Sequence, residues 1–137
     1  IGNLNNLITA QSDLKKLLPD ACFKEDHKEA VKLISKIFAK EDKTQIQLLI
    51  KGTEFQEKIW HALIEIDSGK AICYEELAKR IGNKNSTRAV ALAVARNNIS
   101  YLIPCHRVIR KSGEINKYRW GQEIKKKLLA WESKAAQ

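Results

Sequence analysis

Hydrophobic and polar positions along the chain alternate mainly with helical spacing. Apolar residues fall three and four apart from 25 to 39 and again from 53 to 66, where a threonine three residues before a glutamine forms a capping box. Two shorter helices are predicted at 74–81 and 86–96, separated by a polar turn that begins with Gly82, the residue type expected at a left-handed helix end. Helix, short turn and helix form the helix-turn-helix pattern, although the spacing also fits an ordinary packed pair.

The remaining patterned segments are one helix and two strands. A last helix should run from about 122 to 133, with its apolar positions toward the core and the three lysines 125–127 in solvent. The apolar runs 44–50 and 101–103 have strand character, and Pro104 ends the second because it cannot donate a ladder hydrogen bond.

The positive charge of the chain is unevenly distributed. The 137 residues carry a formal net charge of +9, and 44% of them are hydrophobic, as in an ordinary globular protein. Residues 1–50 contribute 8 Lys and Arg against 7 Asp and Glu, whereas residues 51–137 contribute 17 against 9. A basic C-terminal part is typical of a surface that binds a polyanion, although charge alone also fits a basic protein without such a partner.

The cysteines and the apolar runs bear on location. Three cysteines, an odd number, argue against a disulfide framework and for a cytoplasmic protein. No apolar run approaches the ~20 residues of a membrane span, so we expect no membrane partner. Cys22 and His27 are too few ligands for a tetrahedral metal site, so no metal is expected. The chain starts at Ile1 and has no methionine, so we expect it to be a fragment.

The segment after Pro104 carries the candidate chemistry. Cys105 and His106 are adjacent, and Arg107 and Arg110 add positive charges of the kind that lower a thiol pKa. The residue types alone leave open a buried structural cysteine beside an unrelated histidine.

Pro104-Cys105-His106-Arg107-Val108 resembles the active-site signature of the O6-alkylguanine-DNA alkyltransferases, which move an alkyl group from guanine O6 to their own cysteine. The likeness extends without a gap over roughly 80 residues, and the Tyr-Arg-Trp-Gly sequence at 118–121 is most similar to bacterial members. Further matching positions are Phe55-Gln56, Trp60, Leu63, Tyr74, Leu77-Ala78, Ile81-Gly82, Arg88-Ala89-Val90, Asn97, Leu128-Leu129 and Glu132.

The resemblance implies a role for each of five residues. Cys105 is the alkyl acceptor, His106 deprotonates it through a water molecule, and Glu132 orients the imidazole. Tyr74 donates its hydroxyl to the purine as the alkyl group leaves, and Asn97 is the hinge after the second helix. Without the resemblance, Glu132 is a solvated carboxylate, Tyr74 a half-buried aromatic residue and Asn97 a helix terminator.

The resemblance also implies a double-stranded DNA partner whose alkylated guanine is flipped out of the helix. The second helix of the pair then enters the minor groove, with Arg88 filling the vacated space in the base stack; alone, Arg88 is a surface phosphate or salt-bridge contact. The expected DNA-binding residues are Lys84, Ser86, Thr87, Arg88, Ala89, Ala91 and Arg96. The segment 115–120 is expected to form the wall of the nucleotide pocket, and the pocket residues expected are Val108, Ile115, Tyr118, Arg119 and Trp120.

The fold class expected is α/β (α+β). Residues 1–52 resemble part of a ribonuclease H-like N-terminal domain, and residues 53–137 resemble a mainly helical winged-helix or helix-turn-helix domain with a short sheet. We expect a monomer without a cofactor. Two alternatives remain open: an alkyltransferase-like binding module without transfer activity, which the presence of Cys105 opposes, and a helix-turn-helix transcription factor.

Overall fold

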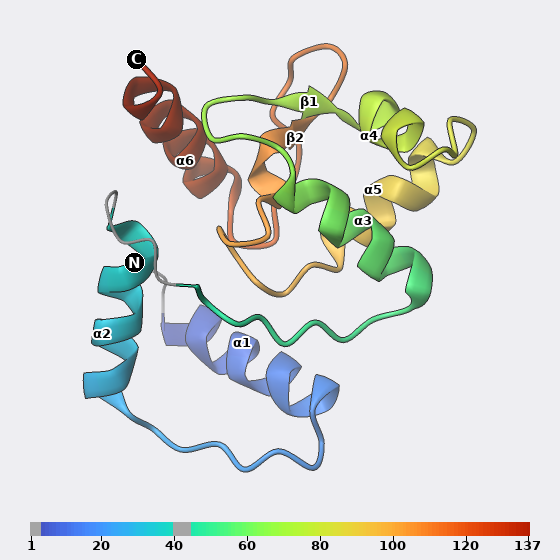
Figure 1. Ribbon diagram of the computed structural model, residues 1–137. Helices are drawn as coiled ribbons and strands as arrows, with labels where there is room; N and C mark the ends of the chain where they lie inside the picture. The colour runs from blue at the N-terminus through green and yellow to red at the C-terminus, as the bar shows by residue number, and fades with distance from the viewer. Residues whose placement is uncertain (1–3, 40–44) are drawn as a thin grey trace. The chain divides into compact units, whose positions relative to one another are not determined.

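The computed structural model describes residues 4–39 and 45–137, and the chain separates into two compact units, Ile1–Lys51 and Gly52–Gln137 (Figure 1). The first unit contains α1 (Leu4–Leu17) and α2 (His27–Phe38). The strand predicted at 44–50 is wrong for residues 45–50, which form no strand, and Thr44 lies outside the described residues. A segment of strand character needs a neighbouring strand to pair with, and no pairing with residues 45–51 is present in the part that the structure describes.

Helix α2 confirms the predicted amphipathic helix. Its first turn is capped by the Asp26 carboxylate, which accepts a hydrogen bond of 3.0 Å from the Glu29 backbone N–H. The apolar residues Val31, Ile34 and Phe38 share one face and are all exposed. The periodicity therefore predicted the helix correctly, but the apolar face that it implies is not buried.

The second unit begins with α3 (Glu54–Ile64), and the predicted capping box at its start is confirmed. The Thr53 hydroxyl accepts from the Gln56 backbone N–H at 3.2 Å, and the Gln56 side chain accepts from the Thr53 N–H at 3.0 Å. Ile59 and Leu63 on this helix are fully buried. Trp60 is buried with them, and its indole N–H is satisfied by the Ala93 carbonyl at 2.9 Å.

The predicted pair of short helices is present as α4 (Tyr74–Arg80) and α5 (Thr87–Ala95). Gly82 joins them with a φ of +78°, as expected for a left-handed helix end. The Asn83 N–H closes this end by donating to the Ala78 carbonyl at 2.9 Å. Helix α5 packs against both α3 and α4, so the second helix of the pair is held in a fixed orientation within this unit (Figure 1).

A short parallel sheet is formed by two strands, one before α4 and the other after α5 in the chain. Strand β1 (Ile72–Cys73) pairs with β2 (Val108–Ile109), with Ile72 opposite Val108 and Cys73 opposite Ile109. The strand predicted at 101–103 is wrong: this segment is a turn, and Tyr101 has a φ of +66°. The pairing comes later in the chain, after the 3₁₀ helix η1 (Cys105–Arg107).

The last helix, α6 (Gln122–Ala135), is where predicted, but the side chains that it buries are not those expected. Lys125 and Glu132 are each only 1% exposed, whereas Ile124 and Trp131 are 38% and 40% exposed. The expected exposure of Lys125 is therefore wrong, because polar partners inside the unit draw this side chain inward.

The architecture is mixed: helices predominate, and the described residues form a small two-stranded parallel sheet. Among these residues no helix has the length and apolar character to cross a membrane.

Candidate functional site

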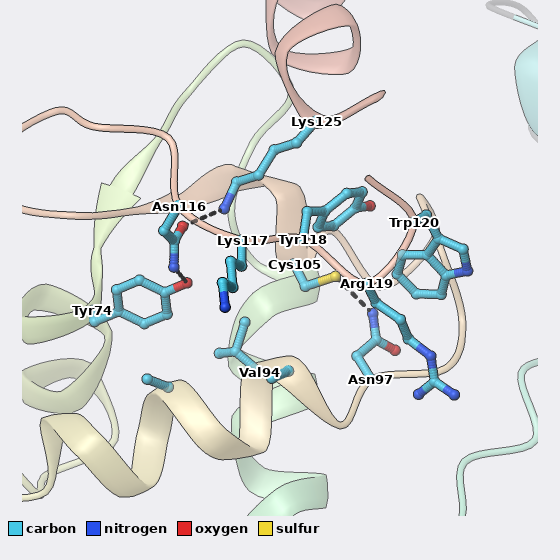
Figure 2. Close-up of a pocket in the computed structure, with 12 residues that line it drawn as sticks. Tyr74, Val94, Asn97, Cys105, Asn116, Lys117, Tyr118, Arg119, Trp120 and Lys125 are labelled. Atoms are coloured by element: carbon cyan, nitrogen blue, oxygen red, sulfur yellow. Dashed lines mark hydrogen bonds between the residues drawn. The ribbon is translucent and has the colours of Figure 1, made fainter. Parts of the chain in front are cut away.

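A cavity of about 180 Å³ lies in the second unit, between α5 on one side and the loop that leads to α6 on the other (Figure 2). This volume is below the roughly 300–1,000 Å³ of pockets for drug-sized ligands, so the cavity suits a ligand no larger than a single ring system. The residues that line it are Tyr74, Ala91, Val94, Ala95, Asn97, Cys105, Asn116, Lys117, Tyr118, Arg119, Trp120 and Lys125.

The Cys105 thiol is one wall of the cavity. It is 4% exposed and stands at the start of η1, directly after Pro104. The Asn97 side-chain amide donates to Sγ at 3.1 Å and to the carbonyls of Ile99 and Ile103 at 3.0 and 2.9 Å, so its two hydrogens are shared among three acceptors. Asn97 thus fixes both the thiol and the turn that precedes it.

Burial raises the pKa of the Cys105 thiol, and the Asn97 amide, the Tyr118 hydroxyl and the positive charge of Lys125 oppose that rise only in part. The thiol is therefore protonated near neutral pH and needs a base before the sulfur can attack. The expectation that neighbouring arginines activate it is wrong. Arg110 forms an exposed ion pair with Glu114, 2.9 Å long.

The two residues that follow Cys105 in the chain form a buried network with Glu132. The His106 Nε2 is 3.0 Å from Glu132 Oε1, and Arg107 donates to both oxygens of the same carboxylate at 2.9 and 2.6 Å. Arg107 also donates to the carbonyl of Ile66. A bidentate arginine on a buried carboxylate holds it in one orientation, and the carboxylate in turn fixes the imidazole.

The electrostatics of this network leave the imidazole neutral. Burial would raise the pKa of Glu132, but the hydrogen bonds from Arg107 and His106 outweigh it and hold the pKa below its usual range. Burial lowers the pKa of His106 despite the opposing effect of Glu132. The other ring nitrogen, Nδ1, is buried and has no hydrogen-bond partner among the described residues. A neutral histidine with one free nitrogen can accept a proton.

A second polar network crosses the cavity from α4 to α6. The Asn116 amide donates to the Tyr74 hydroxyl at 2.7 Å, and Lys125 Nζ donates to the Asn116 side-chain oxygen at 3.0 Å (Figure 2). Lys125 also donates to the Val108 carbonyl at 2.6 Å. Burial lowers the pKa of Lys125 to about 8, against the raising effect of Cys105.

The expected pocket residues divide into two groups. Tyr118, Arg119 and Trp120 line the cavity, with the Tyr118 ring edge-on to Trp120 at 5.3 Å and the Arg119 guanidinium 6.0 Å from the Trp120 ring centre. Val108 and Ile115 are not among the lining residues. Val108 is fully buried in β2, and Ile115 is half-buried.

Helix α5 has one face on the cavity and another in solvent. Ala91 and Ala95 line the cavity, whereas Arg88, Leu92 and Arg96 are exposed one turn apart along the helix. The helix contains no acidic residue. Of the other expected DNA-binding residues, Lys84 and Ala89 are exposed and Ser86 and Thr87 are half-buried.

Residues 54–134 match the family model of the 6-O-methylguanine DNA methyltransferase, DNA binding domain. This chain belongs to that family. The resemblance carried by the Pro-Cys-His-Arg-Val segment is thereby confirmed.

Two relatives illustrate the range of the methyltransferase family that the chain matches. It is 39% identical over 132 residues to the methylated-DNA–protein-cysteine methyltransferase of Methanosarcina mazei, covering 94% of this chain and 84% of that protein. It is 36% identical over 132 residues to the bifunctional transcriptional activator/DNA repair enzyme Ada of Escherichia coli, covering 91% of this chain and 36% of Ada. The chain spans less than half the length of several curated relatives, for example 43% of the Kluyveromyces lactis protein.

A solved structure of the family has the same fold. The OGT of Mycobacterium tuberculosis, crystallised in complex with DNA, aligns with a TM-score of 0.69 and 35% sequence identity, over 77% of this chain and 66% of that one.

Sequence reasoning missed what two polar residues do in this cavity. Lys125 was expected in solvent because it belongs to a run of three lysines, and Asn116 was expected only as part of the pocket wall at 115–120, without a role of its own. For Lys125 the sequence offers one indirect signal: it lies two helical turns before Glu132 and so shares its side of the helix.

Proposed function

We propose that this chain is a methylated-DNA–protein-cysteine methyltransferase that repairs DNA by direct reversal. It transfers the alkyl group of O6-methylguanine, and of O4-methylthymine, irreversibly to Cys105. The observation that carries the proposal is a buried thiol on the wall of a cavity about the size of one base, followed in the chain by a neutral imidazole that is hydrogen-bonded to an ionised carboxylate.

The chemistry follows from the protonation states. His106 Nδ1 takes the thiol proton through a water molecule, and Glu132 stabilises the imidazolium that forms. The sulfur then attacks the alkyl carbon, an S–C bond forms, and the C–O6 bond breaks with its electron pair left on guanine. Guanine gains one proton in place of the alkyl group, so the thiol proton balances the reaction. The thioether has no path back to a thiol, and no cofactor is consumed.

The supporting residues act at the purine and at the thiol. Tyr74 lines the cavity and is the donor to the departing purine; burial raises its pKa, so it keeps its proton at neutral pH. Asn97 holds the sulfur at 3.1 Å and ties it to the end of α5. Tyr118, Arg119 and Trp120 form the wall against which the flipped base packs.

The partner is double-stranded DNA, read from the minor groove. That groove is only ~6 Å wide, so a helix can approach it closely only through small residues such as Ser86, Thr87 and Ala89. Arg88 fills the space of the flipped nucleotide, while Lys84 and Arg96 contact phosphates. Because α5 also borders the cavity through Ala91 and Ala95, a base leaving the duplex at this helix has a short path to Cys105.

The same proposal includes the type of each domain, the oligomeric state of the protein and its location in the cell. Residues 53–137 form a winged-helix type of DNA-binding domain, residues 1–52 are part of a ribonuclease H-like domain, and the protein acts as a monomer in the cytoplasm. The helix-turn-helix pair with Gly82 at its turn supports the first of these assignments.

A label-transfer experiment tests the function. Duplex DNA carrying radiolabelled O6-methylguanine is incubated with the protein, and the label on protein is counted. We expect one label per molecule, with transfer lost in Cys105→Ala and retained in Cys73→Ala, the matched control for a thiol at a half-buried position. Tight binding to the damaged duplex without transfer would instead identify an alkyltransferase-like binding module, and binding indifferent to the lesion a helix-turn-helix regulator.

A further inference from the structure

Three elements are joined by a single side chain on the wall of the cavity. Tyr74 begins α4, Lys125 lies in α6, and Asn116, in the loop between β2 and α6, contacts both, at 2.7 and 3.0 Å (Figure 2). All three line the cavity. The Tyr74–Asn116–Lys125 bridge therefore lies next to the space that a bound base would occupy.

The chemistry of lysine fixes the orientation of the Asn116 amide. An ammonium group can only donate hydrogen bonds, so the atom that faces Lys125 must be the amide oxygen. The amide nitrogen then faces Tyr74, and an NH₂ group can only donate. The Tyr74 oxygen is consequently an acceptor in this contact.

It follows that the Tyr74 proton is free for another partner. With its oxygen occupied by the Asn116 donor, the hydroxyl can donate only elsewhere, and the side chain lies on the cavity wall. If the amide were reversed, its oxygen would capture this proton. The orientation imposed by Lys125 thus decides whether Tyr74 presents a donor or an acceptor to the cavity.

The bridge also carries charge. Among the described residues Lys125 has no carboxylate partner: its Nζ donates to the neutral oxygens of Val108 and Asn116 and lies 5.8 Å from the centre of the Tyr118 ring. A cation at the oxygen end of an amide polarises that amide, which strengthens the hydrogen bond donated by the nitrogen end. A stronger bond to the phenol oxygen makes the phenol proton more acidic, as the lowering effect of Asn116 on the pKa of Tyr74 indicates.

We propose that Asn116 is a positioning residue for alkyl transfer, which orients the Tyr74 hydroxyl toward the purine and couples it to the positive charge of Lys125. The inference rests on the proposed function, since it concerns how the departing guanine is stabilised. Asn116 neither touches the sulfur nor exchanges protons; it acts through Tyr74.

Two substitutions separate this role from mere packing, measured as the single-turnover rate constant for label transfer from O6-methylguanine DNA. Asn116→Ala should lower the rate constant about 10-fold, because the hydroxyl loses its fixed orientation. Asn116→Asp should lower it about 100-fold, because the carboxylate still accepts from Lys125 but also captures the Tyr74 proton. Affinity for unmodified duplex should stay within about 2-fold in both variants. Ser112→Ala, in the same loop and outside the cavity, is the matched control and should transfer at the wild-type rate.

A double-mutant cycle supplies the decisive readout. In a Tyr74→Phe background, Asn116→Ala should change the rate constant by less than about 2-fold, because the group through which it acts is gone. A full 10-fold loss in that background, or a wild-type rate in Asn116→Ala, would overturn the inference while label transfer by the wild-type protein still stood. Absence of transfer by the wild-type protein would instead overturn the proposed function.

Discussion

Two charges are buried on the same helix, and the protein treats them differently. Glu132 and Lys125 lie two turns apart on α6, and each is 1% exposed. Glu132 meets a guanidinium and an imidazole, with three contacts of 3.0 Å or less. Lys125 meets the oxygens of Val108 and Asn116 and, at 5.8 Å, the Tyr118 ring, all of them neutral groups. Among the described residues the charge of Glu132 is therefore compensated by an opposite charge, and that of Lys125 is not.

The difference shows in the direction of each pKa. The pKa of Glu132 is held low against the effect of burial, so its charged form is favoured in the folded state. The pKa of Lys125 falls to about 8 because burial dominates, so its charged form is disfavoured. A compensated charge can be part of what holds a fold together, whereas an uncompensated one is maintained at the expense of stability. A buried charge without a counter-charge, such as that of Lys125, is typical of a group retained for function.

The largest expected effect is at the compensated charge. Glu132→Gln leaves the Arg107 guanidinium buried without a counter-charge, so the free energy of unfolding should fall by about 3–5 kcal/mol, measured by urea denaturation. Label transfer should also be lost, because His106 no longer has an orienting carboxylate. Glu123→Gln, on the exposed side of the same helix, is the control and should cost less than about 0.5 kcal/mol. A loss below about 1 kcal/mol for Glu132→Gln would remove the distinction between the two charges.

An intermediate effect is expected in the pH dependence of stability. Between the folded pKa of Lys125, about 8, and its ordinary value of 10.5, the unfolded chain binds more protons than the folded one. The free energy of unfolding should therefore rise with pH in this window, by about 1 kcal/mol from pH 8 to 9. The measurement is the difference between wild type and Lys125→Met, because Cys105 and the buried tyrosines, whose pKa values are raised, act in the opposite direction. Equal slopes for the two proteins would show that Lys125 titrates normally.

The smallest expected effect is at the uncompensated charge near neutral pH. Lys125→Met relieves a buried cation but leaves two oxygens without a donor, so the free energy of unfolding at pH 7 should change by less than about 1 kcal/mol. The rate constant for label transfer should nevertheless fall about 10-fold, because the bridge to Tyr74 loses its anchor. Lys126→Met, the adjacent exposed position, should leave both quantities unchanged. A stability loss comparable to that of Glu132→Gln would contradict the comparison.

The sequence predicted those features that depend on local geometry. The capping box at Thr53 and the left-handed turn at Gly82 are properties of a few consecutive residues, and both were confirmed. The two predicted strands were wrong, since a strand needs a partner that periodicity does not reveal. At 101–103 the Asn97 side chain bonds the backbone of Ile99 and Ile103 and holds the segment as a turn.

The candidate site was predictable as far as the resemblance reached and no further. Cys105, His106 and Glu132 were named from the family signature, and the structure brings the last two within 3.0 Å. The directions of charged side chains were not predictable: Arg107 turns to Glu132 and Lys125 turns inward. A lysine in a run of lysines gives no sign of burial, because the acceptors that receive it, the Val108 carbonyl and Asn116, come from other parts of the chain.

The two-residue pairing of β1 with β2 has a consequence for the spacing of two groups that line the cavity. Tyr74 follows β1 at once, and η1, which begins with Cys105, directly precedes β2. The segment that contains α4 and α5 therefore begins and ends at paired strands, because Ile72–Cys73 and Val108–Ile109 are hydrogen-bonded to each other. Tyr74 and Cys105, which lie far apart in the sequence, are therefore each anchored next to one end of this ladder. The spacing between the Tyr74 hydroxyl and the Cys105 thiol depends on the pairing, so its loss would be felt at both groups at once.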